Sequence, residues 1–230
     1  MPTPPWPPVD RVKCPLAVLV SGGLDSAILL AESLRSYAAV HPLYVQVAAR
    51  WEAVELAYLR RFLAAVAAPN LRPLVVLSQP VADVYGEHWC LSGDGVPASD
   101  SPDDAVFLPG RNVLLLAKPL LWCHLNRVPA IATAPLASNP FPDADAAFYD
   151  GFAGVVSRAV AGQVRVLRPY ADLGLGKADV LRRGVAMPLC HTFSCLDPVG
   201  GLHCGRCNKC AERQHGFRDA GLPDPTTYAN

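Results

Sequence analysis

Charged residues are scarce in this sequence, and their signs cancel. They make up 17% of the 230 residues, with 20 lysines and arginines against 20 aspartates and glutamates. The absence of net charge argues against a protein that coats nucleic acid or binds membranes through a polybasic surface. It leaves room for a local basic site that binds a phosphate-bearing ligand. The hydrophobic fraction of 51% predicts that most of the chain folds around a core.

Long hydrophobic runs are also missing. No window approaches the roughly 20 consecutive apolar residues that a membrane-spanning helix requires. The opening MPTPPWPPVDRVK lacks the apolar stretch of a signal peptide, and its prolines predict a flexible arm over residues 1–14. We therefore expect a soluble, cytoplasmic protein with no membrane partner. A chain of 230 residues is long enough for one sizeable domain with a small appendage.

The eight cysteines are unevenly distributed. Cys14, Cys90 and Cys123 are scattered, whereas the other five crowd into residues 190–210. A disulfide framework would spread its cysteines along a secreted chain. A tight cluster in a chain that looks cytosolic instead favours a metal site.

Four cysteines of this cluster have the spacing of a metal knuckle: Cys195, Cys204, Cys207 and Cys210. Their thiolates suit a tetrahedral zinc ion, and four protein ligands leave no open position, so we expect a structural zinc. An iron–sulfur cluster is the alternative, but its fourth cysteine usually follows the run and precedes a proline. His191, His203 and His215 are not needed as ligands, and Cys190 has no assigned role.

Short apolar runs alternate with amphipathic segments before the cysteine cluster. Strands are expected at residues 16–20, 41–47, 73–77, 129–133 and 164–167. Helices are expected after the first strand and at 50–67, 112–126, 148–161 and 177–183, with Pro119 marking a kink or an early stop. Residues 79–104 read as an irregular excursion, and we interpret it as a lid or substrate loop.

This alternation predicts the fold class. We expect an α/β, Rossmann-like fold: a mostly parallel five-stranded sheet with helices on both faces, plus a small C-terminal zinc-binding tail. The α/β domain is placed at residues 15–186 and the cysteine-rich tail at residues 187–230. Ligands of such sheets bind beyond the carboxyl ends of the strands, where the polar segments of this chain fall.

The first predicted strand ends in a loop, Ser21-Gly22-Gly23-Leu24-Asp25-Ser26, that leads into a helix. Glycines let the backbone approach an anion, and the free amides and dipole of the first helical turn favour negative charge. Asp25 cannot serve the phosphate itself, so we expect it to bind magnesium, and Asp25 or Ser26 to cap the helix. The Walker pattern and the third glycine of the dinucleotide fingerprint are absent. An ordinary strand-to-helix turn is the simpler alternative.

The loop resembles the signature of the ATP pyrophosphatases, a group that contains GMP synthetase, NAD synthetase, argininosuccinate synthase and the tRNA thiolases. The resemblance implies that residues 15–186 form an ATP pyrophosphatase domain with ATP and Mg²⁺ as ligands. Such enzymes cleave ATP between the α- and β-phosphates and adenylate a carboxylate or carbonyl oxygen. The ATP-binding residues implied are Val20, Ser21, Gly22, Gly23, Leu24, Asp25, Ser26 and Ala27.

The tail resembles that of the 7-cyano-7-deazaguanine synthases, with a Cys-Gly-x-Cys-x-x-Cys-x-x-Arg run and a Gly-x-x-Asp-Pro ending. Segments 108–112, 168–172 and 177–180 match in the same order, so the resemblance covers about residues 15 to 225. It implies a C–N ligase of queuosine biosynthesis that converts 7-carboxy-7-deazaguanine and ammonia to the nitrile preQ0 with two ATP. Asp25, Arg111 and Lys177 are the catalytic residues that the resemblance implies.

Two segments depart from that family. Members have Asp-Tyr-Gly-Gln-Arg-His after the second strand, of which this chain retains Arg50, and the Cys-Arg pair expected after Pro142-Asp143 is gone. The alternatives are an enzyme of the same superfamily that adenylates another carboxylate or deazapurine, a tRNA thiolase, and a non-enzymatic zinc-binding module. Neutral charge counts against nucleic-acid binding, and the intact loop counts against a pure adaptor. A homodimer is left open.

Overall fold

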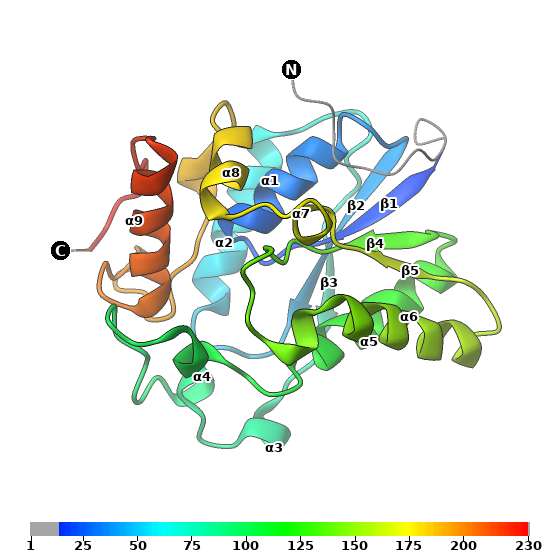
Figure 1. Cartoon of the computed structure of the whole chain (residues 1–230), viewed down its shortest axis with the longest axis horizontal. Helices are drawn as coiled ribbons and strands as arrows, with labels where there is room; N and C mark the ends of the chain where they lie inside the picture. Colours follow the sequence, from blue (N-terminus) through cyan, green and yellow to red (C-terminus); the bar gives the residue numbers. More distant parts are fainter. Residues whose placement is uncertain (1–13, 230) are drawn as a thin grey trace.

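The computed structural model describes residues 14–229, so nearly all of the expected N-terminal arm lies outside the described residues (Figure 1). At its centre is a five-stranded sheet with the order β3-β2-β1-β4-β5. All four neighbouring pairs of described strands run parallel. The strands are β1 (Pro15–Leu19), β2 (Ala39–Gln46), β3 (Val75–Ser78), β4 (Ala130–Ala132) and β5 (Arg165–Leu167). The predicted fold class is therefore confirmed.

Helices follow each strand in the described chain. The longer ones are α1 (Leu24–Ser33), α2 (Glu52–Ala65), α5 (Arg111–Leu125), α6 (Ala146–Ala159) and α9 (Asn208–Ala220). The shorter ones are α3 (Ala82–Tyr85), α4 (Trp89–Ser92), α7 (Pro169–Asp172) and α8 (Lys177–Arg183). Three short 3₁₀ helices are η2 (Asp103–Val106), η3 (Pro142–Ala144) and η4 (Leu189–His191).

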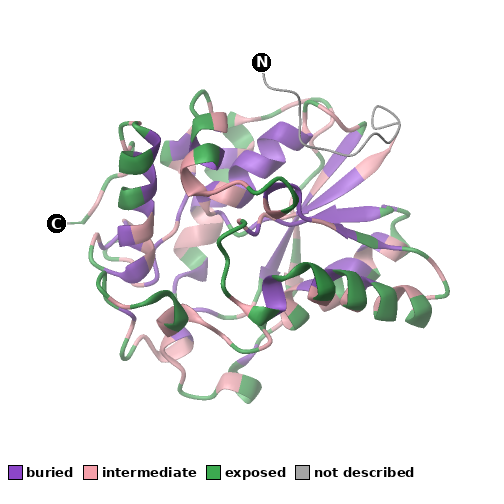
Figure 2. Cartoon of the chain, viewed as in Figure 1, coloured by how far each residue is buried: buried purple, intermediate pink, exposed green. Residues whose placement is uncertain are grey.

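The central strands of the sheet are buried on both faces because they alternate apolar side chains between two helical layers, whereas the edge strand β3 is partly exposed. Leu16 and Val18 of β1 pack with α1, α2 and α8, whereas Ala17, between them, packs with α5 and α6 on the other side. Figure 2 shows the strands as the buried centre and the outer turns of the helices as the exposed surface. This double burial is why the strands read as continuous apolar runs in the sequence.

The strand order creates a crevice directly after β1. From β1 the chain moves to β2 and β3 on one side of it, and later returns to place β4 and β5 on the other side. The strands that follow β1 in the chain are therefore added first on one side of it and then on the other. The loop after β1 lies at this switch point of the sheet, where such folds bind ligands.

The structure corrects local details of three expected segments. Helix α1 is capped by Gly23, with no side-chain hydrogen bond, so neither Asp25 nor Ser26 is its N-cap. The helix expected at 112–126 is confirmed as α5, and the early stop considered at Pro119 does not occur. The side chain of Pro119 is buried against the core, and packing outweighs the missing backbone N–H. The excursion at 79–104 is not wholly irregular, since it contains α3 and α4.

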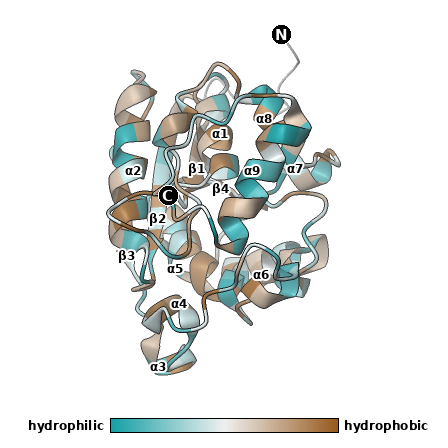
Figure 3. Cartoon of the chain, turned by 90° about the vertical axis from the view of Figure 1, so that its left-hand side faces the viewer, coloured by the Kyte–Doolittle hydropathy of each residue, from teal (hydrophilic) through white to brown (hydrophobic). Residues whose placement is uncertain are grey.

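A buried cation holds the C-terminal tail together. Arg213 of α9 is 1% exposed and donates hydrogen bonds to Thr192 Oγ1 at 2.9 Å and to the Leu189 carbonyl at 3.1 Å. A further bond to Thr226 Oγ1 at 2.5 Å holds the last residues described. Helix α9 also packs along α8, and Figure 3 shows the two side by side, each with hydrophilic turns. Arg213 thus joins segments of the tail to one another, and the packing of α9 against α8 attaches the tail to the α/β domain.

Candidate functional site

A cavity of about 510 Å³ opens at the carboxyl ends of the strands. Its walls come from the loop after β1, the ends of β2 and β4, the first turns of α2, α5 and α8, the excursion at 79–104, and α9. The sequence-predicted residues that line it are Val20, Ser21, Gly23, Leu24, Asp25, Ser26, Arg111 and Lys177. Gly22 and Ala27 are not among the lining residues, and Ala27 is buried in the core.

The loop after β1 is held by its own polar atoms. The Ser21 amide donates to Ser26 Oγ at 3.2 Å, and Ser26 Oγ donates to the Gly23 carbonyl at 3.3 Å. Gly22 has a φ of 76°, and a Cβ there would lie 3.0 Å from Glu55 Cγ and 3.2 Å from the Glu55 carbonyl. Only glycine fits this close approach and this left-handed backbone. The loop is therefore preshaped, with its helix N-terminus facing the cavity.

Asp25 heads a chain of alternating charges. Its Oδ2 lies 2.6 Å from Lys177 Nζ, which also lies 2.9 Å from Glu212 Oε1. The other oxygen of Glu212 lies 2.5 Å from Lys209 Nζ. Asp25 Oδ1 is buried and has no hydrogen-bond partner among the described residues. A buried carboxylate oxygen without a donor suits a hard cation such as Mg²⁺.

The charges of this chain support one another electrostatically. Burial alone would lower the pKa of Lys177, but the carboxylates of Asp25 and Glu212 outweigh it and raise the pKa above its ordinary value. Burial likewise opposes ionisation of Glu212, yet Lys177 and Lys209 lower its pKa to about 2. Lys177 therefore stays cationic and Glu212 stays ionised at neutral pH. The sequence did not single out Lys209 or Glu212. Both lie within or just after the cysteine run, which was read as a metal site only.

Arg111 stands at the start of α5 and reaches the same cavity. It is exposed, and none of the described carboxylates lies within ion-pair distance of it. Next to it, the Asn112 amide donates to Asp143 Oδ2 at 3.0 Å, and Asn112 Nδ2 donates to the Asp143 carbonyl at 2.8 Å. Asp143, in the second segment that departs from the family, is thus fixed in the cavity wall next to the start of α5, where the unpaired Arg111 stands.

Arg50 does not line the cavity. It pairs with Asp197 of the tail at 3.1 Å, and its amide donates to the Cys90 carbonyl at 2.9 Å. With Arg50 matched to the arginine of Asp-Tyr-Gly-Gln-Arg-His, the family's glycine falls at Ala48, which has a φ of 66°. An alanine in the left-handed region is strained by about 1–2 kcal/mol. The backbone at Ala48 is therefore one that glycine adopts without strain and that this chain adopts with alanine.

Two carboxylates of α2 were missed by sequence reasoning. Glu52 accepts hydrogen bonds from the amides of Val47 and Ala48, whereas Glu55 accepts one from the Tyr44 hydroxyl at 2.6 Å. Burial raises the pKa of Glu55 to about 8, although the Tyr44 bond and the Arg111 charge oppose the shift. The only signal in the sequence was a pair of acidic residues in a helix that follows a strand end.

We expect Glu55→Gln to change how stability depends on pH. Below about pH 4.5 the Glu55 carboxyl is protonated in the folded and in the unfolded protein. Between about pH 4.5 and pH 8 it is protonated only in the folded protein. The unfolded chain then binds fewer protons, so stability falls as pH rises through this window. Glutamine stays neutral, so the variant should gain roughly 1–2 kcal/mol on wild type from pH 5 to 9, after discounting for partial exposure.

Thermal unfolding at several pH values measures this gain. The exposed Glu87 provides the matched control, because Glu87→Gln makes the same change where solvent screens the charge. A constant difference between Glu55→Gln and wild type across the whole range would contradict the raised pKa.

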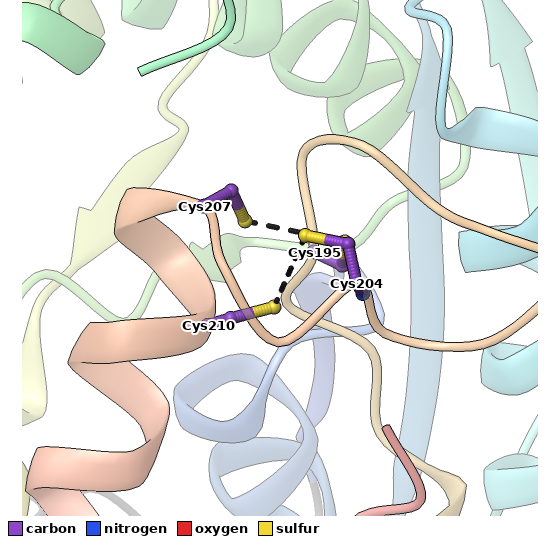
Figure 4. A group of neighbouring side chains, drawn as sticks. All are labelled: Cys195, Cys204, Cys207 and Cys210. Atoms are coloured by element: carbon purple, nitrogen blue, oxygen red, sulfur yellow. Dashed lines mark hydrogen bonds between the residues drawn. The ribbon is translucent and has the colours of Figure 1, made fainter. Parts of the chain in front are cut away.

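The four tail cysteines converge on one point (Figure 4). Cys195, Cys204, Cys207 and Cys210 are all buried, and their sulfurs lie within 4.8 Å of one another. The Cys204–Cys210 and Cys195–Cys207 sulfur pairs are 3.9 and 4.0 Å apart. A tetrahedron with zinc–sulfur bonds of about 2.3 Å has edges of about 3.8 Å, whereas a disulfide needs about 2.05 Å. The cluster fits a zinc site and not a pair of disulfides.

Backbone amides complete the surroundings of these sulfurs. Cys204 N donates to Cys195 Sγ at 3.2 Å, and Leu196 N donates to Cys207 Sγ at 3.4 Å. Such donors favour the thiolate form that a metal requires. His203 is buried nearby but accepts a bond from the Ser194 amide, and Cys190 is exposed outside the cluster. In the part of the chain that the structure describes, no other group of three or more His, Cys, Asp or Glu side chains lies close enough together to hold a metal ion.

Within residues 14–229, none of the helices combines the length and apolar character needed to cross a bilayer.

Comparison with known proteins gives a consistent result. The family model for the queuosine biosynthesis protein QueC matches residues 16–221. A 7-cyano-7-deazaguanine synthase of Anaeromyxobacter sp. (strain Fw109-5) is 34% identical over 228 residues, with 92% of this chain and 94% of the relative covered. A protein of the same name from Thiobacillus denitrificans is also 34% identical, with 92% of this chain and 97% of the relative covered. Another from Myxococcus xanthus is 33% identical, with 92% of this chain and 96% of the relative covered. The chain belongs to the QueC family of queuosine biosynthesis proteins.

Proposed function

We propose that this protein converts 7-carboxy-7-deazaguanine and ammonia to 7-cyano-7-deazaguanine, with two ATP cleaved to AMP and pyrophosphate. Membership of the family and relatives named 7-cyano-7-deazaguanine synthase support the reaction. The observation that carries it furthest is the convergence of the loop after β1, Asp25, Arg111 and Lys177 on one cavity.

The reaction requires a carboxylate to lose an oxygen, which is a poor leaving group as oxide. Transfer of AMP to the carboxylate makes AMP the leaving group, and attack by ammonia then forms the amide. A second transfer, to the amide oxygen, lets AMP leave again as the nitrile forms. The protein's task is to hold the phosphates, neutralise their charge and exclude water while the reacting groups are aligned.

The residues divide this task according to their surroundings. Of the loop residues, those that line the cavity would hold ATP, with the amides at the start of α1 facing the phosphates: Val20, Ser21, Gly23, Leu24, Asp25 and Ser26. Asp25, with its unpartnered oxygen, would bind Mg²⁺. Lys177 and the unpaired Arg111 would contact phosphate or carboxylate oxygens. Cys195, Cys204, Cys207 and Cys210 would hold a structural zinc ion.

A second candidate is adenylation of a different carboxylate. It is favoured by Arg50, which pairs with Asp197 outside the cavity instead of facing a substrate. The missing Cys-Arg pair after Asp143 points the same way, since a site that reads a polar edge rejects analogues by large factors.

The test is mass spectrometry of a reaction that contains ATP, Mg²⁺, ammonium and 7-carboxy-7-deazaguanine. We expect the nitrile, with two AMP formed for each nitrile. ATP turnover only with another acid would keep the activation chemistry and replace the substrate. Absence of ATP turnover with every acid tried would contradict an enzymatic function.

A further inference from the structure

Helix α9 and the residue before it contribute side chains to both the cysteine cluster and the cavity. Cys207 and Cys210, at its start, point into the cysteine cluster, whereas Lys209 and Glu212 line the cavity that contains the loop after β1. The side chains of Lys209 and Glu212 are 31% and 36% exposed, so both remain accessible from the cavity. The tail therefore supplies charged groups to the site in addition to its metal ligands.

The way these groups are paired suggests what they bind. One carboxylate, Glu212, is shared by two ammonium groups, with Lys177 on Oε1 and Lys209 on Oε2. With two lysines and two carboxylates, the four paired side chains from Asp25 to Lys209 carry no net charge. If Asp25 gives its oxygens to a divalent cation, the two ammonium groups retain one carboxylate between them. The excess positive charge then faces a helix N-terminus, an arrangement suited to a polyanion.

We propose that Lys209 is a further phosphate-binding cation of this site, in addition to Lys177 and Arg111, and that Glu212 is the positioning residue that holds Lys177 and Lys209 on the same wall. The inference rests on the proposed function, because it takes a nucleotide triphosphate and its pyrophosphate product as the ligand. Lys209 lies between two metal ligands, so the metal site fixes the backbone from which this cation extends.

Calorimetric titration of the zinc-loaded protein with magnesium pyrophosphate tests the role of Lys209 without needing an acceptor. Lys209→Gln should weaken binding about tenfold or more, since a hydrogen bond to a charged group contributes roughly 1.5–3 kcal/mol. Lys209→Arg, which keeps the charge, should restore affinity to within about threefold. Lys118→Gln is the matched control, because Lys118 is exposed, bonds to the Ser78 carbonyl and lies outside the cavity.

Unchanged pyrophosphate affinity in Lys209→Gln would overturn the proposal, and so would loss of zinc by this variant, since the residue would then act through the metal. If wild type binds neither ATP nor magnesium pyrophosphate, the proposed function fails instead.

Glu212→Gln tests the positioning role. It removes the carboxylate but neither cation, so kcat should fall about tenfold while the KM for ATP changes by less than about twofold. A parallel loss of kcat and melting temperature, or no change in kcat, would contradict positioning.

Discussion

Replacement of Asp25 by alanine is expected to abolish ATP-dependent AMP formation, with a loss of about 10²–10³-fold or more. Asp25 has one oxygen on Lys177 at 2.6 Å and another that is buried without a partner among the described residues, so alanine removes both the proposed magnesium ligand and the partner of a cation. The fold should survive, because the N-cap of α1 is Gly23 and the lost helix-dipole interaction contributes only about 0.3–1 kcal/mol.

Release of radiolabelled AMP from ATP measures this effect, with circular dichroism as the check on folding. Asp219→Ala provides the control, since it removes a carboxylate of α9 that pairs with Arg218 on the surface. Near-normal AMP release by Asp25→Ala would remove the basis for assigning the loop to ATP.

Loss of a single tail cysteine is expected to have the largest effect on stability. Cys207→Ser should release zinc and lower the free energy of unfolding by about 5 kcal/mol or more, because structural zinc contributes its binding energy to folding. The sulfurs are buried, and the cluster joins the loop that carries Cys195 to the start of α9. Without the metal, Lys209 and Glu212 would also lose their fixed backbone.

Metal analysis and thermal unfolding of the same samples measure the two losses together. Cys190→Ser is the control, since Cys190 is exposed and lies outside the cluster, and it should retain both metal and melting temperature. Full zinc occupancy in Cys207→Ser would show that the ligand set is wrong.

Local signals in the sequence were enough for the elements of the fold. Strand β1 and the loop after it were recognised because a doubly buried strand is a run of apolar residues, and because Gly22 must adopt a backbone that other residues avoid. Element ends were less exact, since packing decided them. Pro119 shows this, because α5 passes through it.

The sequence by itself also determined most of the cysteine cluster, because Cys204, Cys207 and Cys210 are three residues apart in a tight turn and must lie close in space. Cys195, nine residues before Cys204, joins them through the path of the intervening loop. Only the tertiary structure decided which distant charges meet. Asp25 and Lys177 are 152 positions apart, and their contact depends on the sheet order and on the packing of α8 against α1. Glu55, Glu212 and Lys209 looked like ordinary surface residues in the sequence. Their place in the cavity follows from long-range packing, which no local pattern of residue types records.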